Sequence, residues 1–265
     1  MARTALLNVM VQAALKAGRG LVRDFGEVEN LQVSLKGPGD FVSAADRRAD
    51  ETLIAELTRA RPTWSLLTED SGEIAGSDRN HRWIVDPLDG TTNFLHGIPL
   101  FAVSVGLVRD GKLVAGVVYN PVLNELYTAE RGGGAFLNDR RLRVAARRSL
   151  ADAVIATGVP AIGKPGRERF PEELTRLMDK VAGIRRSGSA ALDLAWVASG
   201  RYDGYWQRGL ASWDIAAAIV IVTEAGGTVT DLDGGDRMLA DGTIVAGNDR
   251  IHPALRAALS PTTPG

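Results

Sequence analysis

The apolar segments of this chain are short, and in its first half they come in pairs that a turn can join. Residues 102–108 and 113–119 form such a pair, and the intervening Arg-Asp-Gly-Lys at 109–112 is typical of a hairpin turn. Residues 65–67 and 82–85 also have the length and character of strands. Antiparallel strands are therefore expected to dominate this half.

Helical spacing is found at both ends of the chain. The first two dozen residues repeat apolar side chains every three to four positions, at Leu6, Leu7, Met10, Ala13, Ala14, Ala17 and Leu21. A second helix is predicted over 45–60, ended by Pro62.

After about residue 145, strands and helices alternate. We expect strands at 154–157, 202–206, around Val229 and at 244–246, and helices at 172–181, 190–198, 215–224 and 253–259. Such alternation is typical of an α/β layer. The sequence thus predicts an α/β (α+β) protein with an N-terminal half, 1–145, and a C-terminal half, 146–265, joined as one compact unit.

Composition excludes several classes of protein. With 45% hydrophobic and 24% charged residues in 265, the chain is typical of a globular protein, and its net charge of −1 argues against a surface built wholly for nucleic acid. The absence of cysteine excludes disulfides, thiolate metal sites and cysteine nucleophiles. The longest apolar run, 215–222, is far shorter than the ~20 residues that cross a bilayer, and the N-terminus lacks the uninterrupted apolar centre of a signal peptide. We therefore expect a cytoplasmic protein.

An unusual density of polar groups follows one apolar strand. In Trp-Ile-Val-Asp-Pro-Leu-Asp-Gly-Thr-Thr-Asn-Phe, residues 83–94, Asp86 and Asp89 flank Pro87, which is expected to turn the chain so that both carboxylates point into one space. Gly90 permits close backbone approach, and residues 91–93 resemble the capped first turn of a short helix, whose free NH groups attract an anion.

Two carboxylates beside an anion site need a cation between them. Like unit charges ~4 Å apart repel by about 4 kcal/mol at an effective dielectric constant of about 20. Oxygen ligands without histidine or cysteine favour Mg²⁺ over Mn²⁺ or Ca²⁺, and Mg²⁺ commonly bridges to phosphate. The alternative interpretation is that Asp86 and Asp89 only cap a turn.

Acidic residues at two other places favour the metal interpretation. Glu69 and Asp70 follow another predicted strand, and Asp214 stands at the start of a long apolar helix. The alternative for Asp214 is a helix N-cap, which contributes about 1 kcal/mol.

Several motifs together resemble the inositol monophosphatase family, within the lithium-sensitive, magnesium-dependent phosphatases that include fructose-1,6-bisphosphatases. The motifs are WIVDPLDGTTNFLHGIPLFAVSVGL from Trp83, SWDIAAAIVIVTEAGG from Ser212, LKGPGDFVSAAD from Leu35, TED from Thr68, GVVYNPVLNELYTAERGGGAFLN from Gly116 and RSGSAALDLAWVASGRYDGYW from Arg186. The resemblance covers nearly the whole chain. It implies a layered α/β/α/β/α sandwich and a homodimer.

The resemblance also implies a set of metal ligands. Glu69, Asp86 and the Leu88 carbonyl would hold a first Mg²⁺, and Asp86, Asp89 and Asp214 a second, with a third, weaker ion near Glu69. Four carboxylates facing a phosphate dianion are tenable only with positive charge between them, which agrees with this assignment.

The implied reaction is the hydrolysis of a phosphate monoester by an in-line attack of water. The family pattern assigns Glu69 and Thr91 to orienting and deprotonating the water, with Asp46 polarising Thr91, which is not a covalent nucleophile. The backbone NH groups of Gly90 and Thr91 would hold the phosphate.

The substrate side is where this chain departs from the family pattern. In the family, the segment equivalent to Gly188, Ser189 and Ala190 contacts the sugar-like ring, and Asp89 and Asp214 also face the substrate. The position of Gln207 is commonly a glutamate that binds a substrate hydroxyl, so a preference for inositol phosphate is in question while the metal chemistry is not. The alternative is that Gln207 is a tolerated variant in an enzyme with the same substrate.

The sequence is compatible with three functions. The first is an inositol monophosphatase acting on small polyol phosphates, and the second is the same chemistry on fructose 1,6-bisphosphate, histidinol phosphate or a phosphonucleotide. The third is a binding role, because some bacterial members of the family join transcription complexes on ribosomal RNA operons. The basic segment Arg140–Ser149 is compatible with RNA or protein contact, or with a solvated face.

Other polar residues have simpler interpretations. His81, His96 and His252 lie in no catalytic pattern and are expected on the surface or in loops, and residues 166–173 are expected to form an exposed loop. Gly132–Phe136 lacks the lysine of a phosphate-binding loop and is interpreted as a turn. Lys36 has two interpretations, a solvated surface charge or a residue with a role near the metal site.

Overall fold

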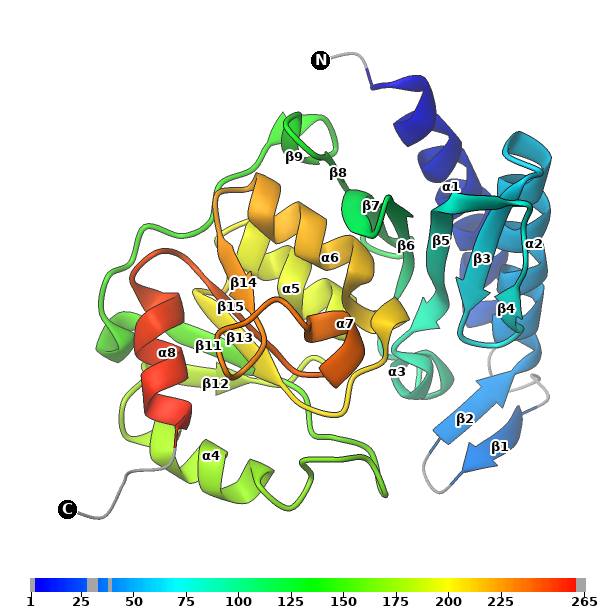
Figure 1. Ribbon diagram of the computed structural model, residues 1–265. Helices are drawn as coiled ribbons and strands as arrows, with labels where there is room; N and C mark the ends of the chain where they lie inside the picture. The colour runs from blue at the N-terminus through cyan, green and yellow to red at the C-terminus, as the bar shows by residue number, and fades with distance from the viewer. Residues whose placement is uncertain (1–2, 28–32, 38–39, 261–265) are drawn as a thin grey trace.

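Five layers of helix and sheet make up the protein (Figure 1). The computed structural model describes residues 3–27, 33–37 and 40–260. From one side to the other, α1 (Ala5–Phe25) and α2 (Ala44–Ala60) cover an eight-stranded sheet, α5 (Ala190–Ala198) and α6 (Ser212–Glu224) form the central layer, and a five-stranded sheet follows. The outer face of that second sheet is covered by α8 (Ile251–Leu259), against which α4 (Phe170–Met178) packs. The predicted layered α/β sandwich is confirmed.

The remaining elements are short or belong to the sheets. The short helices are α3 (Thr91–Leu95), α7 (Met238–Asp241) and a 3-10 turn at Leu150–Asp152. The strands of the N-terminal half are β1 (Val33–Gly37), β2 (Asp40–Ser43), β3 (Trp64–Thr68), β4 (Gly72–Ile74), β5 (Asp78–Asp89), β6 (Ala102–Arg109), β7 (Lys112–Asn120), β8 (Glu125–Glu130), β9 (Gly134–Leu137) and β10 (Arg140–Arg141). Those of the C-terminal half are β11 (Val154–Thr157), β12 (Gly183–Arg185), β13 (Gly204–Gln207), β14 (Thr228–Thr230) and β15 (Ile244–Gly247).

The first sheet is mostly antiparallel, as the paired apolar segments predict. Its order is β10-β9-β8-β7-β6-β5-β3-β4, and β3 and β5 form its parallel pair. The predicted hairpin joins β6 to β7 through Asp110 and Gly111, both with positive φ (51° and 73°), which is the conformation that two-residue hairpin turns require. The second sheet has the order β12-β11-β13-β15-β14 and mixes parallel and antiparallel pairs.

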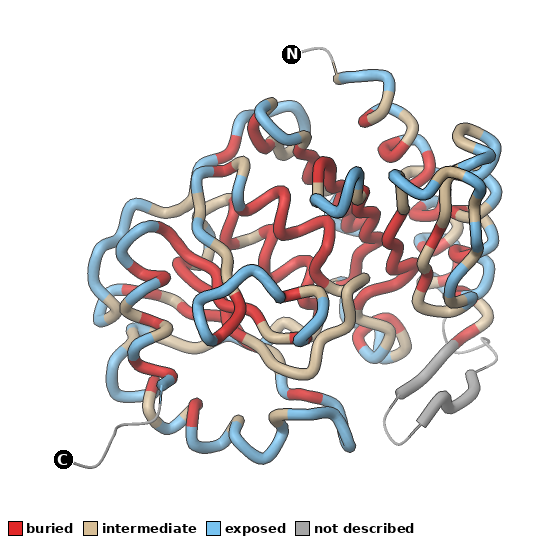
Figure 2. Tube along the Cα trace, viewed as in Figure 1, coloured by how far each residue is buried: buried red, intermediate tan, exposed pale blue. Residues whose placement is uncertain are grey.

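The central helices are apolar on all sides because sheets lie on both of their faces. Figure 2 shows this middle layer as largely buried. All residues of α6 from Ile215 to Val222 are buried, and α6 packs closely on β7 because Gly116 has no side chain: a methyl group there would lie 2.2 Å from the Ala217 carbonyl oxygen. This contact joins the C-terminal half of the chain to the first sheet.

Several boundaries differ from the sequence-based expectation. Segment 166–173 is an exposed turn only as far as Arg169, since α4 begins at Phe170 and Glu173 is buried with its carboxylate bonded to Arg208 (2.7 Å). His252 is buried in α8 and hydrogen-bonded to Thr230 (2.9 Å), so its expected surface position is wrong. His81 lies in β5, stacked on Trp64, whereas His96 is exposed at the end of α3. The periodic pattern missed these contacts because they join segments distant in the chain.

None of the helices in the described part of the chain combines the length and apolar character that a membrane span needs. Every described strand of the first sheet precedes residue 142, and every described strand of the second follows residue 153.

Candidate active site

Two acidic residues lie side by side at the ends of parallel strands. In the register of β3 and β5, Thr68 pairs with Val85, and the Glu69 NH donates to the Val85 carbonyl (3.2 Å). Glu69 and Asp86 each come directly after this pair, so they lie next to each other on neighbouring strands. Their positions come from backbone pairing, which explains why two segments 17 residues apart deliver carboxylates to one place.

The chain does not leave the strand at Pro87, contrary to the sharp turn expected there. β5 continues to Asp89, and the pairing with β6 shifts between Asp86 and Asp89, which is a bulge in the ladder. The Asp86 carboxylate accepts a hydrogen bond from the Leu88 NH (3.0 Å), so it folds back over the bulge. A bulge tolerates the missing NH of proline, and it directs both Asp86 and Asp89 toward the interior.

Asp89 connects this bulge to the C-terminal half. Its Oδ2 accepts hydrogen bonds from the Ser189 hydroxyl (2.6 Å) and the Ala191 NH (2.7 Å), at the first turn of α5. Ser189 is the N-cap of that helix and also accepts from the Leu192 NH. The segment Gly188–Ala190, predicted to contact the substrate, thus lies directly beside Asp89.

Asp214 approaches from the start of α6. It is not the N-cap of the helix, as one interpretation held, because it stands at the third helical position and its Oδ2 accepts from the NH of Ala211 (2.7 Å). The Ser104 hydroxyl of β6 donates to the Trp213 carbonyl (3.4 Å), and Ser104 pairs with Asp86 in the sheet. This contact holds the first turn of α6 over the strand that carries Asp86.

The three aspartates of the cluster have raised pKa values. Burial raises the pKa of Asp86 well above its usual value, and the charges of Glu69, Asp89 and Asp214 raise it further. Burial likewise raises the pKa of Asp214, with Asp89 and Glu69 adding to the effect. The pKa of Asp89 rises to about 6 through burial, although its hydrogen bonds from Ser189 and Ala191 act against the rise. Buried like charges at this density are unfavourable unless positive charge lies among them.

The donor set fits a hard divalent cation. It consists of carboxylates and the nearby Leu88 carbonyl, with no histidine or thiol, which is the ligand chemistry of Mg²⁺. In the described part of the chain, no three His, Asp or Glu side chains could hold an ion as they stand. Asp86, Asp89 and Asp214 each direct one oxygen toward a donor of the chain, which leaves the other oxygen of each carboxylate for an ion.

A hydroxyl group lies next to this cluster. Thr91, the first residue of α3, directs its Oγ1 to the Asp46 carboxylate (3.0 Å) and the Leu88 carbonyl (3.1 Å). The other Asp46 oxygen accepts from the NH of Ser43, in the capping box of α2. Asp46 is therefore a fixed acceptor for Thr91, and its burial raises its pKa.

Backbone shape around Thr91 depends on two glycines and one asparagine. Gly90 has φ of 95°, and a methyl group there would lie 3.0 Å from the Leu100 carbonyl oxygen. It is the residue before α3, which has no side-chain cap, contrary to expectation. Asn93 donates to the carbonyls of Leu100 (2.6 Å) and Ser187 (2.8 Å) and lies against Gly188. Asn93 was not singled out from the sequence, because its role is to join two segments 94 residues apart.

A pocket of about 130 Å³ opens beside Asp89 and Asp214. It is lined by Asp89, Gly158, Val159, Arg186, Gly188, Ser189, Ala190, Asp193, Gln207, Leu210 and Asp214. The structure thus brings the predicted substrate-side residues, Gln207 included, to the acidic cluster. Asp193 and Arg186 were not predicted, since neither stands in a pattern that separates it from an ordinary helical or surface residue.

Other predicted features lie elsewhere. Gly132 and Gly134 donate backbone NH groups to Glu224 (2.8 Å each) in the turn before β9, which agrees with a structural role for this glycine-rich segment. Lys36 lies in β1, but its side chain falls outside the described part of the structure. The arginines of Arg140–Ser149 are exposed, and Arg147 forms an ion pair with Asp203 (3.1 Å).

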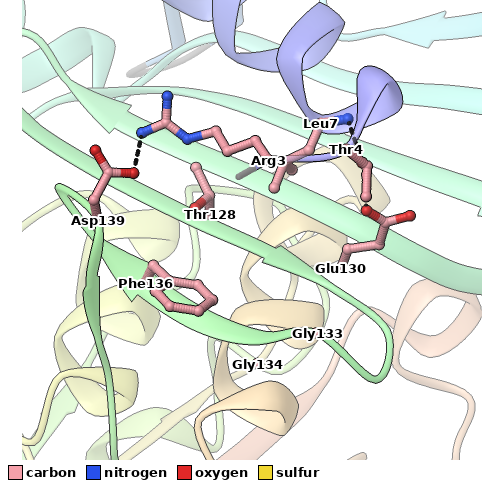
Figure 3. A pocket seen from close by; sticks show the side chains of 9 residues that line it. All are labelled: Arg3, Thr4, Leu7, Thr128, Glu130, Gly133, Gly134, Phe136 and Asp139. Carbon is pink, nitrogen blue, oxygen red and sulfur yellow. Dashed lines mark hydrogen bonds and ion pairs between the residues drawn. The ribbon is translucent and has the colours of Figure 1, made fainter. Parts of the chain in front are cut away.

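A second cavity, of about 150 Å³, lies where the start of α1 meets β8 and β9 (Figure 3). Arg3 reaches across it to Asp139 (2.8 Å), and Thr4 donates to Glu130 (2.6 Å). Phe136 forms part of the wall. The residues that line this cavity include none of the four clustered carboxylates.

Comparison with known proteins agrees with this geometry. The model of the inositol monophosphatase family matches residues 2–263. The chain belongs to this family. It is 63% identical over 259 residues to the inositol-1-monophosphatase of Mesorhizobium japonicum, covering 98% of this chain and 97% of that protein. It is 43% identical over 252 residues to the Nus factor SuhB of Escherichia coli, covering 95% and 94%.

A solved structure of a family member also matches closely. The extragenic suppressor protein suhB from Bartonella henselae superposes with a TM-score of 0.95 at 59% identity, covering 98% of this chain and all of that one. Membership in the family, predicted from the sequence motifs, is thereby confirmed.

Proposed function

We propose that this protein is a magnesium-dependent phosphate monoester hydrolase of the cytoplasm that acts on inositol 1-phosphate. The observation that carries the proposal is the convergence of Glu69, Asp86, Asp89 and Asp214 from three distant segments onto one buried edge. Membership in the inositol monophosphatase family, and 63% identity to a protein named inositol-1-monophosphatase, support the choice of substrate.

We assign the metal ligands as the resemblance implies. Glu69, Asp86 and the Leu88 carbonyl would hold one Mg²⁺, and Asp86, Asp89 and Asp214 would hold another. A third, weaker ion would lie near Glu69. When bound, magnesium supplies positive charge that offsets the carboxylates, lowers the pKa of water and stabilises the leaving alkoxide.

The chain's own residues would position the attacking water. The Thr91 hydroxyl donates its proton to Asp46, so its remaining lone pairs can accept a hydrogen bond from water. Because that acceptor is fixed by the capping box of α2, Thr91 has one preferred orientation. Glu69 would accept the proton that the water loses, and the backbone NH groups of Gly90 and Thr91 would bind phosphate oxygens.

The substrate alcohol would occupy the pocket beside Asp89 and Asp214, where Gly188, Ser189, Ala190 and Gln207 lie. This placement orients the ester bond toward Thr91 and Glu69. It also puts the chemistry at the junction of the two halves, where motion of either half would disturb the reacting geometry.

A substrate panel tests the proposal. Phosphate release would be measured from inositol 1-phosphate, fructose 1,6-bisphosphate, histidinol phosphate and a phosphonucleotide, with and without Mg²⁺. We expect magnesium-dependent turnover with the highest kcat/KM on inositol 1-phosphate, and inhibition by lithium. Turnover confined to another ester, or unaffected by chelator, contradicts the proposal.

A second candidate function is participation in a transcription complex. The 43% identity to proteins named Nus factor SuhB and the exposed arginines of Arg140–Ser149 favour it. Recovery of RNA polymerase or antitermination factors with the tagged protein would support this role, and their absence would remove it. Sedimentation of the pure protein would test the homodimer that the family resemblance implies.

A further inference from the structure

The pocket that Asp89 and Asp214 line also contains three polar side chains with no part in the proposed proton transfer. These are Arg186, in the loop before α5, Asp193, in the first turns of α5, and Gln207, at the end of β13. They come from the C-terminal half of the chain. Their hydrogen-bonding state shows what kind of ligand the pocket is suited to.

Asp193 is buried, and no hydrogen bond of normal length and angle reaches its carboxylate. Its residue is 1% exposed, and neither carboxylate oxygen has a hydrogen-bond partner among the described residues. Ser187 lies near enough to favour the ionised form of Asp193, but its hydroxyl makes its hydrogen bonds to Ser189, donating to the carbonyl and accepting from the NH (both 3.3 Å). An unpaired buried carboxylate is unfavourable, so a hydrogen-bond donor from a ligand would find a strong acceptor here.

Gln207 is held in one orientation. Its side-chain oxygen accepts a hydrogen bond from the Tyr205 hydroxyl. Its carboxamide also lies directly on Gly158, where a methyl group would come within 2.0 Å of that oxygen. With the oxygen engaged by Tyr205, the NH₂ group of Gln207 is the part left to donate to a ligand.

The pKa of Asp193 reflects opposing neighbours. Burial raises this pKa to about 7 and the charge of Asp89 adds to the rise, whereas Ser187 and the Arg186 guanidinium favour the ionised form. Three carboxyl groups, those of Asp89, Asp193 and Asp214, line this pocket with the single arginine, which favours neutral groups over a second phosphate. A hydroxyl group is neutral and both donates and accepts, so it can bond to Asp193 and to Gln207 or Arg186 at once.

We propose that Asp193 is a specificity-determining residue that accepts a hydrogen bond from a hydroxyl group on the alcohol part of a polyol phosphate. Gln207 donates to the same hydroxyl or to its neighbour. This inference rests on the proposed phosphatase activity and names the side chain by which the pocket recognises a polyol.

The test compares two esters in three variants. The readout is the ratio of kcat/KM for inositol 1-phosphate to kcat/KM for phenyl phosphate, whose alcohol part carries no further hydroxyl group. In Asp193→Leu, of similar size but without an acceptor, the ratio should fall about tenfold. In Asp193→Asn, which keeps one acceptor oxygen, it should fall by about threefold. Asp179→Asn, a change to an exposed carboxylate at the end of α4, serves as the matched control and should leave the ratio unchanged.

Each outcome decides the inference. A ratio within twofold of the wild-type value, in whichever Asp193 variant folds, overturns it, because a merely structural role lowers activity on both esters alike. If the wild-type protein cleaves phenyl phosphate but not inositol 1-phosphate, the proposed substrate fails and this inference fails with it. If the wild-type protein cleaves both esters and an Asp193 variant loses kcat/KM equally on both, the role of Asp193 is overturned while the proposed phosphatase function stands.

Discussion

At the scale of single residues, the candidate site contains buried acids that hydrogen bonds hold in place. Asp89 is tied to the start of α5 and Asp214 to Ala211, both by hydrogen bonds to donors without charge. These bonds orient the carboxylates but leave their mutual repulsion in place. Residue-level changes therefore have opposite consequences for activity and for stability.

Replacing one of these acids by its amide should separate the two consequences. We expect Asp89→Asn or Asp214→Asn to lower magnesium-dependent kcat by at least about 100-fold, since an amide is a weaker metal ligand. The metal-free variant should unfold at the same temperature or higher, because one buried like charge is gone. Phosphate release and thermal denaturation measure the two effects. Asp110→Asn, at the exposed β6–β7 turn, is the control, and wild-type rates in either site variant would contradict the assignment.

The hydrogen bond between Thr91 and Asp46 makes a second residue-scale prediction. Thr91→Val removes the hydroxyl at nearly constant volume and should lower kcat by about 100-fold, within the usual range for a group that assists proton transfer. Thr91→Ser keeps the hydroxyl and should retain most of the activity. Steady-state kinetics distinguish the two variants. Equal activity in both would exclude a role for the hydroxyl.

At the scale of elements, the site depends on how closely α6 lies on the first sheet. Gly106 and Gly116 face this helix, and a methyl group at Gly116 would lie within 3 Å of three backbone atoms of Ala217. Backbone atoms cannot move aside as side chains do. The position of Asp214, three residues before Ala217, is thus set by two glycines in strands β6 and β7.

Gly116→Ala should accordingly displace α6. We expect a loss of about 1–3 kcal/mol in the free energy of unfolding, the usual range for overpacking, together with reduced kcat. Gly20→Ala, in α1, is the matched control, since nothing lies within 4 Å of its added methyl group, and it should stabilise the protein by about 0.5–1 kcal/mol. Denaturant titration measures both values. An unaffected Gly116→Ala variant would mean that the packing of α6 can adjust.

At the scale of the whole molecule, proton binding, metal binding and stability are linked through the acidic cluster. An acid whose pKa is raised in the folded state binds more protons when folded than when unfolded. For Asp89, with a pKa of about 6 against about 3.9 unfolded, the metal-free protein loses stability as pH rises from about 4 through 6. The raised pKa values of Asp86 and Asp214 extend this loss to higher pH.

Magnesium should therefore stabilise the protein more at high pH than at low pH. We expect the increase in Tm on adding Mg²⁺ to be small at pH 5, where protons occupy the cluster, and clearly larger at pH 7.5. Thermal denaturation with Mg²⁺ and with chelator at both pH values measures the difference, and Asp214→Asn should reduce it. An equal increase at both pH values would rule out these carboxylates as the binding site.

Much of this molecule is determined by its sequence alone. Periodicity and turn residues placed α1, α2, the β6–β7 hairpin, α5 and α6, because each depends on neighbours within a few positions. Four acidic residues at strand and helix ends identified the candidate site together with the family motifs. These features are local, so the residues around them suffice to predict them.

Only the tertiary structure decided how those parts meet. Four features each depend on a segment far away in the chain. They are the bulge at Asp86–Asp89, the hydrogen bond from α5 to Asp89, the burial of His252 and Glu173, and the environment of the Asp193 carboxylate. Contacts of this kind are set by sheet register and by the packing of helices between two sheets. No pattern along the chain records them, because burial and hydrogen bonding between distant segments arise only when the layers assemble.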